Sequence, residues 1–126
     1  MFFIKFITKK YLRDNPNHIF VFGDNLDRKG KGGAAILRDE PNTYGFITKK
    51  KPTTSLNDYF TPDEYKSIYK SEMKNLKNKI IKNSDKLYLI SKIGAGLANK
   101  FGIFEKIIKL NIKNDLKGIK NIKFLW

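Results

Sequence analysis

The sequence of 126 residues contains no cysteine and only one histidine, His18. Without cysteine there is no disulfide framework and no thiolate metal site, and no other metal-ligand cluster stands out. We therefore expect no metal and no cofactor. Long apolar runs are also missing, because Lys5 interrupts the opening MFFIKFITKK and no stretch approaches the roughly 18 apolar residues of a membrane span. These absences predict a cytoplasmic protein with no membrane partner.

Acidic residues are scarce relative to basic ones. Aspartate and glutamate together number 12 against 26 lysines and arginines, which gives a formal net charge of +14. Such an excess favours a polyanionic partner, and DNA bound through the basic surface is one. The alternative is compositional, because an AT-rich coding sequence produces abundant Lys, Ile and Asn without any selection for binding.

Short apolar segments alternate with helical patterns along a chain whose length predicts one domain, residues 1–126. The clearest helix start is Thr61, which is followed by Pro62 at the first helical position and by Glu64 three residues after the cap. The predicted strands are 2–8, 19–23, 44–48, 86–91 and 121–126, and the predicted helices are 33–40, a long one from 61, and 103–117. This order predicts an α/β fold, a three-layer α/β/α sandwich with a mixed, largely parallel sheet.

Three unusual loops follow predicted strands, at the edge where open α/β sheets bind ligands. The first is FGDNLDRKGKGGAA, residues 22–35, and its glycines allow backbone N–H groups to turn toward a phosphate. The second is the lysine-containing FITKKKP, residues 46–52. The third is IGAGLANKFG, residues 93–102. Either glycine loop alone could be a plain connector, but two of them around a lysine loop make a stronger case for a phosphate site.

Taken together, these three segments resemble the macro domain family, which binds ADP-ribose. The residues that carry the likeness are Thr48-Lys49 at the end of one strand and Ile93-Gly94-Ala95-Gly96-Leu97 after a later one. The chain is most similar to the branch that includes terminal ADP-ribose protein glycohydrolase and the DNA ADP-ribosyl glycohydrolase antitoxins, over about residues 19–126. The resemblance implies a macro-like sandwich, with ADP-ribose or an ADP-ribosylated macromolecule as partner.

By position, the resemblance implies that Lys49 is the catalytic residue, at the anomeric carbon of the distal ribose, with Asp24 and Asn25 nearby. A lysine of ordinary pKa, near 10.4, is protonated at pH 7, so attack would require a lowered pKa. A protonated Lys49 would instead clamp a ribose or phosphate oxygen. The ligand-binding residues expected beside it are Gly23, Asp24, Asn25, Gly30, Gly32, Gly33, Ala34, Thr48, Ile93, Gly94, Ala95, Gly96, Leu97 and Asn99.

The function implied by the resemblance is an ADP-ribosyl glycohydrolase that removes ADP-ribose from a macromolecule, DNA above all. Ala98 stands where the protein glycohydrolase has an aspartate, and this departure favours the DNA-directed antitoxins. Two alternatives stay open: a non-catalytic module that binds or sequesters ADP-ribose or a related nucleotide signal, and a hydrolase of small ADP-ribose esters. Composition and resemblance together suggest a phage or low-GC bacterial protein that counters an ADP-ribosylating toxin.

Overall fold

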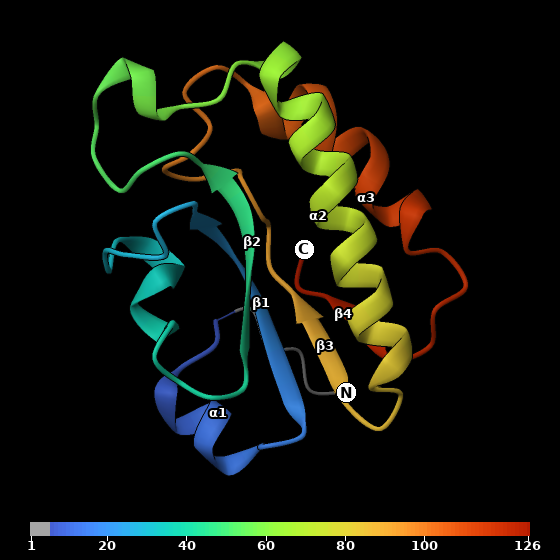
Figure 1. The fold of residues 1–126 in the computed structure, drawn as a ribbon. Coiled ribbons are helices and arrows are strands. Elements are labelled where there is room, and N and C mark those ends of the chain that lie inside the picture. Colours follow the sequence, from blue (N-terminus) through green and yellow to red (C-terminus); the bar gives the residue numbers. More distant parts are fainter. Residues whose placement is uncertain (1–5) are drawn as a thin grey trace.

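A computed structural model describes residues 6–126 of the chain (Figure 1). The first predicted strand, 2–8, lies mostly outside these residues, and its last part, 6–8, is not in a strand. The elements are α1 (Lys9–Asp14), β1 (His18–Asn25), the 3-10 helix η1 (Gly33–Leu37), β2 (Thr43–Lys49), the 3-10 helix η2 (Leu56–Asp58), α2 (Pro62–Lys82), β3 (Leu87–Ile90), the π-helical turn η3 (Phe104–Ile108), α3 (Lys109–Asp115) and β4 (Ile122–Phe124).

The four strands form one sheet in the order β2-β1-β3-β4. Every strand pair in this sheet is parallel, and the only antiparallel pairing among residues 6–126 is a single bridge between Lys49 and Tyr59. The predicted α/β fold with a largely parallel sheet is therefore confirmed, and within residues 6–126 the sheet contains no antiparallel strand pair. From β1 the chain continues to β2 on one side, and from β3 it continues to β4 on the other.

Each face of the sheet has its own apolar cluster, because successive side chains of a strand point to opposite faces. In β1, Val21 points into the larger cluster, which α2, η3 and α3 cover. Phe20 and Phe22 point into the smaller cluster on the other face, where α1 and η1 contribute Leu12 and Leu37. The result is three layers, with the long helices together on one face and two short elements on the other (Figure 1).

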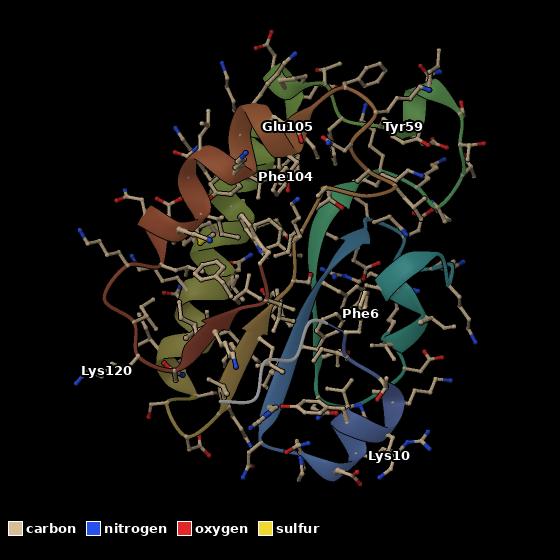
Figure 2. All side chains as sticks on the ribbon, turned by 180° about the vertical axis from the view of Figure 1, so that it is seen from behind. Phe6, Lys10, Tyr59, Phe104, Glu105 and Lys120 are labelled. Atoms are coloured by element: carbon tan, nitrogen blue, oxygen red, sulfur yellow. The ribbon has the colours of Figure 1, made fainter. Side chains whose placement is uncertain are left out.

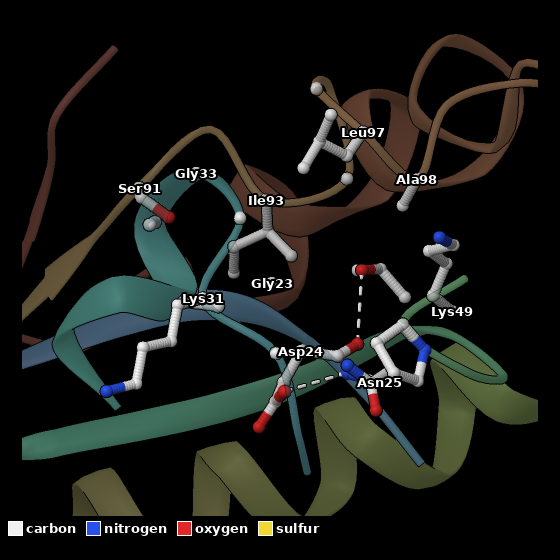
Figure 3. Close-up of a pocket in the computed structure, with 18 of the residues that line it drawn as sticks. Gly23, Asp24, Asn25, Lys31, Gly33, Lys49, Ser91, Ile93, Leu97 and Ala98 are labelled. Atoms are coloured by element: carbon white, nitrogen blue, oxygen red, sulfur yellow. Dashed lines mark hydrogen bonds between the residues drawn. The ribbon is translucent and has the colours of Figure 1, made fainter. Parts of the chain in front are cut away.

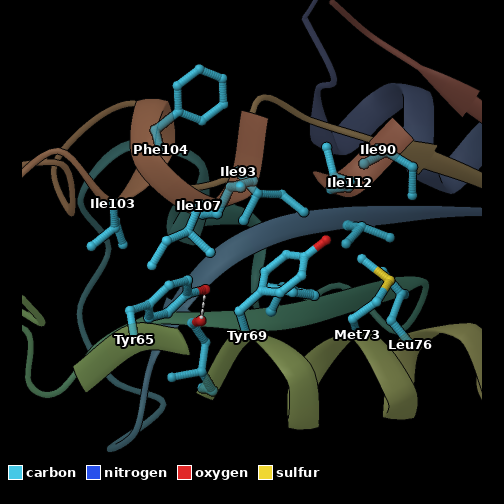
Figure 4. Close-up of a cluster of buried hydrophobic side chains, with 14 of the residues drawn as sticks. Tyr65, Tyr69, Met73, Leu76, Ile90, Ile93, Ile103, Phe104, Ile107 and Ile112 are labelled. Atoms are coloured by element: carbon cyan, nitrogen blue, oxygen red, sulfur yellow. Dashed lines mark hydrogen bonds between the residues drawn. The ribbon is translucent and has the colours of Figure 1, made fainter. Parts of the chain in front are cut away.

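The long helix α2 is stabilised by the capping box at its N-terminus and by one apolar stripe along its length. Its buried residues recur at helical spacing and pack against isoleucines of β3 and of the segment 93–112 (Figure 4). Two side chains of α2 also cover the outer edge of β2 at Ile47. The hydroxyl of Tyr65 donates to the carbonyl oxygen of Ile47 at 2.6 Å, and the carboxylate of Glu72 accepts from the N–H of Ile47 at 2.6 Å. This occupies part of an edge that another strand could otherwise pair with.

Three elements differ from the sequence-based expectation. The helix α1 was not predicted, and Thr8, assigned to a strand, is its cap, accepting from the N–H of Tyr11. The predicted helix 33–40 is only the short η1, because it begins at a glycine and Pro41 follows closely. The predicted helix 103–117 is present as one continuous helix over residues 103–115, and the difference is that its first part, η3, is π-helical before α3 follows. No helix within residues 6–126 has the length and apolar character needed to cross a membrane.

The cap of α2 predicts a pH dependence of stability. Hydrogen bonding from the backbone N–H of Thr61, and then from the Lys50 ammonium, lowers the pKa of Glu64 from 4.5 to about 2. A lowered folded-state pKa means that this stabilisation is complete above pH 4.5 and is lost as the pH falls toward 2. In urea unfolding between pH 5 and 2.5, wild type should lose more stability than Glu64→Gln. Equal losses in the two proteins would show that the Glu64 carboxylate contributes nothing.

Candidate binding site at the carboxyl edge of the sheet

A cavity of about 530 Å³ opens where β1, β2 and β3 end (Figure 3). Gly23 and Asp24 lie near the end of β1, Thr48 and Lys49 end β2, and Ser91 directly follows β3, and all five line the cavity. Because β1 and β3 are neighbours whose connections leave in opposite directions, the cavity lies at the point where the strand order reverses. Open α/β sheets bind their ligands at this topological switch point.

A β-bulge shapes one wall of the cavity. Asp24 pairs with Ile47 and the next residue, Asn25, pairs with Lys49, so Thr48 is the extra residue in β2. Bulges of this kind change where the following side chains point and occur often beside functional sites. In this chain the bulge allows both Thr48 and Lys49 to line the cavity, although neighbouring residues of a regular strand point to opposite faces.

Asp24 has a structural role at the base of the cavity. Its side chain is only 2% exposed, and its carboxylate pairs with Arg38 and, at 3.3 Å, with Arg28. Arg38 also donates to the carbonyl oxygens of Lys29 and Gly30, and thereby fastens the first glycine loop to the end of β1. With both carboxylate oxygens occupied, Asp24 positions this loop and is not available as a free acceptor for a ribose hydroxyl.

Lys49 is nearly buried, with 9% of its surface exposed. Its ammonium donates to the carbonyl oxygen of Thr53 and lies 4.4 Å from the centre of the Tyr59 ring. The loop that contains Thr53 is in turn closed by a hydrogen bond from the Thr53 hydroxyl to the Asp58 carboxylate. A carbonyl oxygen and an aromatic face both stabilise a cationic ammonium. In these surroundings Lys49 is a donor and a positive charge at one end of the cavity.

The lining of the cavity is positively charged and rich in backbone N–H groups. Four lysines contribute to it, and its one carboxylate, Asp24, is already paired with arginines. Within residues 6–126, no hydrogen-bond partner is found for the N–H groups of Gly30 to Ala34, nor for those of Gly94 and of Gly96 to Ala98. Unpaired amides from two loops, together with lysines, form an environment that suits phosphate groups.

The cavity gathers most of the residues that the sequence predicted. Ala95 and Asn99 do not line it. Asn99 instead caps the helix that begins with η3, since its side-chain oxygen accepts from the N–H of Phe104 and its amide donates to Glu105. The predicted residues that do line the cavity are Gly23, Asp24, Asn25, Gly30, Gly32, Gly33, Ala34, Thr48, Lys49, Ile93, Gly94, Gly96 and Leu97.

Sequence reasoning missed several lining residues. Ser91 and Lys92 directly follow β3, so the rule that ligands lie beyond the carboxyl ends of strands could have found them. Pro52 ends the predicted loop 46–52, but the sequence does not specify that this loop folds back over the cavity. The ion pair of Arg38 with Asp24 carries no such signal either. The lining residues that were not predicted are Lys29, Lys31, Ala35, Pro52, Ser91, Lys92 and Ala98.

The fold and the cavity define a small α/β protein with one switch-point site in its described part. The chain belongs to the Family of unknown function (DUF7831), whose model matches residues 2–100. The matched range includes every residue that lines the cavity and ends before η3. None of the curated proteins matches the chain, and no solved structure matches it.

The assignment to the macro domain family was therefore wrong. The model that matches is that of DUF7831, and no macro domain model matches. The segments that suggested the resemblance are two glycine loops and a strand that ends in lysine. Such segments recur wherever a parallel sheet presents a phosphate-binding edge, so they indicate a kind of site more reliably than a family.

Proposed function

We propose that the chain binds a phosphate-bearing nucleotide in the switch-point cavity, with ADP-ribose as the first ligand to test. The observation that carries the proposal is the convergence of two glycine loops, with their unpaired amides, on one positively charged cavity. The cavity volume, about 530 Å³, lies within the range of small-molecule sites, roughly 300–1,000 Å³. A free phosphate would occupy only part of this space, which favours a larger ligand.

Lys49 would bind the ligand rather than attack it. Its ammonium is a donor whose present acceptor, the carbonyl oxygen of Thr53, is neutral. An anionic oxygen in the cavity would be a stronger acceptor, because charge-assisted hydrogen bonds are about twice as strong as neutral ones. The role expected of Lys49 is therefore to hold a phosphate or ribose oxygen at its end of the cavity.

Calorimetric titration with ADP-ribose, ADP and adenosine tests this proposal. We expect the two phosphate-bearing ligands to bind and adenosine to fail. The variant Lys49→Met keeps an unbranched apolar chain beside Tyr59 and removes the charge. Because a hydrogen bond to a charged group contributes about 1.5–3 kcal/mol, its affinity for ADP-ribose should fall about 10- to 100-fold.

The matched control is Lys51→Met, which removes an exposed lysine two residues away that does not line the cavity. It should bind ADP-ribose as wild type does, and melting curves should show that both variants are folded. If wild type binds neither ADP-ribose nor ADP, or if the two variants are weakened equally, the proposal fails.

Hydrolysis at Lys49 is a second candidate, and it is favoured by the nearly buried position of this lysine in the cavity. A DNA oligonucleotide that carries one ADP-ribose on a base would be incubated with wild type and with Lys49→Met, and its mass then measured. Loss of the ADP-ribose mass with wild type alone would make the chain a DNA ADP-ribosyl glycohydrolase. If the oligonucleotide stays intact with both proteins and wild type binds ADP-ribose tightly, the function is binding without hydrolysis.

A further inference from the structure

A row of lysines follows one face of α2, away from the switch-point cavity. Lys66, Lys70, Lys74 and Lys77 are spaced three or four residues apart, so they lie on the same face of the helix, and all four are exposed. Nitrogen-tipped side chains project into solvent around the whole layer formed by α2 and α3 (Figure 2). We call Lys70, Lys74 and Lys77 the lysine row.

The lysine row is not neutralised by neighbouring carboxylates. Lys66 lies 3.5 Å from Asp63, but within residues 6–126 no carboxylate is at ion-pair distance from Lys70, Lys74 or Lys77. Three other carboxylates of the helical layer have partners elsewhere: Glu64 with Thr61 and Lys50, Glu72 with the N–H of Ile47, and Glu105 with Asn99. Asp115 lies beside the row and accepts from the hydroxyl of Tyr69. Three lysines beside one carboxylate leave an excess of positive charge for an external partner.

The three lysines also line a shared groove of about 190 Å³, whose other walls are Tyr69, Met73 and Asp115. From Lys70 to Lys77 the helix rises about 10 Å, at 1.5 Å per residue. One strand of DNA presents a phosphate about every 3.4 Å along the helix axis, so the row spans about three phosphates. The length of the row therefore fits a short stretch of nucleic-acid backbone.

We propose that the lysine row binds the phosphate backbone of duplex nucleic acid, independently of base sequence. Single-strand binders usually stack bases on exposed aromatic rings, and the only aromatic residue of the groove, Tyr69, is buried. An acidic protein partner would normally also cover apolar surface, but the apolar residues between the lysines, Met73 and Leu76, are buried as well. Lysines without a stacking or apolar surface favour contact with phosphates alone.

The test compares two triple variants that lose the same charge. Lys70→Gln/Lys74→Gln/Lys77→Gln removes the row, and Lys9→Gln/Lys10→Gln/Lys51→Gln removes three exposed lysines from α1 and from the loop after β2. Fluorescence anisotropy with a labelled 20-base-pair DNA duplex of mixed sequence would measure affinity from 50 to 200 mM salt. Each phosphate contact contributes about 0.9 to the slope of log affinity against log salt, so loss of the row should lower that slope by about 2.7.

Over this salt range, wild type should therefore lose about 40-fold more affinity than the row variant, and the control should behave as wild type. The row variant should still bind ADP-ribose as wild type does if the cavity functions as proposed, which separates the two sites. The inference is overturned if wild type does not bind the duplex at 50 mM salt, or if both triple variants show the same slope. If poly-glutamate bound wild type with the same affinity and the same salt slope as the duplex, the inference would be overturned in favour of an acidic protein partner.

Discussion

Arg38→Ala is expected to destabilise the fold by about 3 kcal/mol. The substitution removes the main partner of Asp24, whose carboxylate is almost fully buried, and breaking a buried ion pair costs about 3–5 kcal/mol because a charge is left unpaired. It also removes the donors that hold the carbonyl oxygens of Lys29 and Gly30. Urea unfolding measures the loss, which is a large part of the roughly 5–15 kcal/mol of a typical domain.

The matched control is Arg28→Ala, which removes the second arginine beside the same carboxylate. The side chain of Arg28 is 51% exposed, against 18% for Arg38, so its ion pair is screened by water and should contribute about 1 kcal/mol or less. Arg38→Lys should lie between the two, since lysine keeps the charge but lacks the planar fork. If the two alanine variants are equally stable, Arg38 is not the residue that holds Asp24 and the glycine loop together.

Gly94→Ala is expected to have a comparable effect, about 3 kcal/mol. Gly94 has a φ of +81°, where a residue with a Cβ is strained by about 1–2 kcal/mol. The new methyl group would also lie 2.5 Å from Cδ1 of Ile108, which is fully buried and has little room to move. Overpacking of this kind adds about 1–3 kcal/mol. Thermal unfolding would show the loss.

Gly96→Ala is the control for that prediction. Gly96 is in the same loop and lines the same cavity, but nothing lies within 4 Å of the position that an added methyl group would take, and its φ is not in the left-handed region. Its stability should stay within about 0.5 kcal/mol of wild type. Two variants of equal stability would mean that the close approach of Gly94 to Ile108 does not constrain the loop.

The fold could be predicted from the sequence where local signals were strong. Thr61, Pro62 and Glu64 predicted the start of α2 because a capping box is a local pattern, and the apolar run 19–23 predicted the core of β1. The helix α1 is only six residues long and buries one of them, Leu12. One buried residue is too few for a helical repeat of apolar residues to be recognised in the sequence. The largely parallel sheet was predicted from the alternation of strands and helices, whereas the order β2-β1-β3-β4 was not, because it depends on which strands become neighbours.

The glycine loops were predictable because they directly follow strands, and the carboxyl ends of parallel strands meet at one edge. The clamp between Asp24 and Arg38 was not, since it joins residues fourteen apart through a turn whose path only the folded chain defines. The bulge at Thr48 likewise has no signal in the sequence. The family assignment failed because short glycine and lysine motifs describe phosphate chemistry that unrelated proteins share.

The most direct test of the central claim is a titration of the ¹⁵N-labelled protein with ADP-ribose, followed through its amide resonances. If the switch-point cavity binds a phosphate-bearing nucleotide, the amides of residues 30–34 and 94–98 should shift together and saturate at one concentration. The amides of the lysine row on α2 should stay in place. Shifts at neither glycine loop, or shifts confined to the lysine row, would contradict the claim and leave the cavity without its proposed ligand.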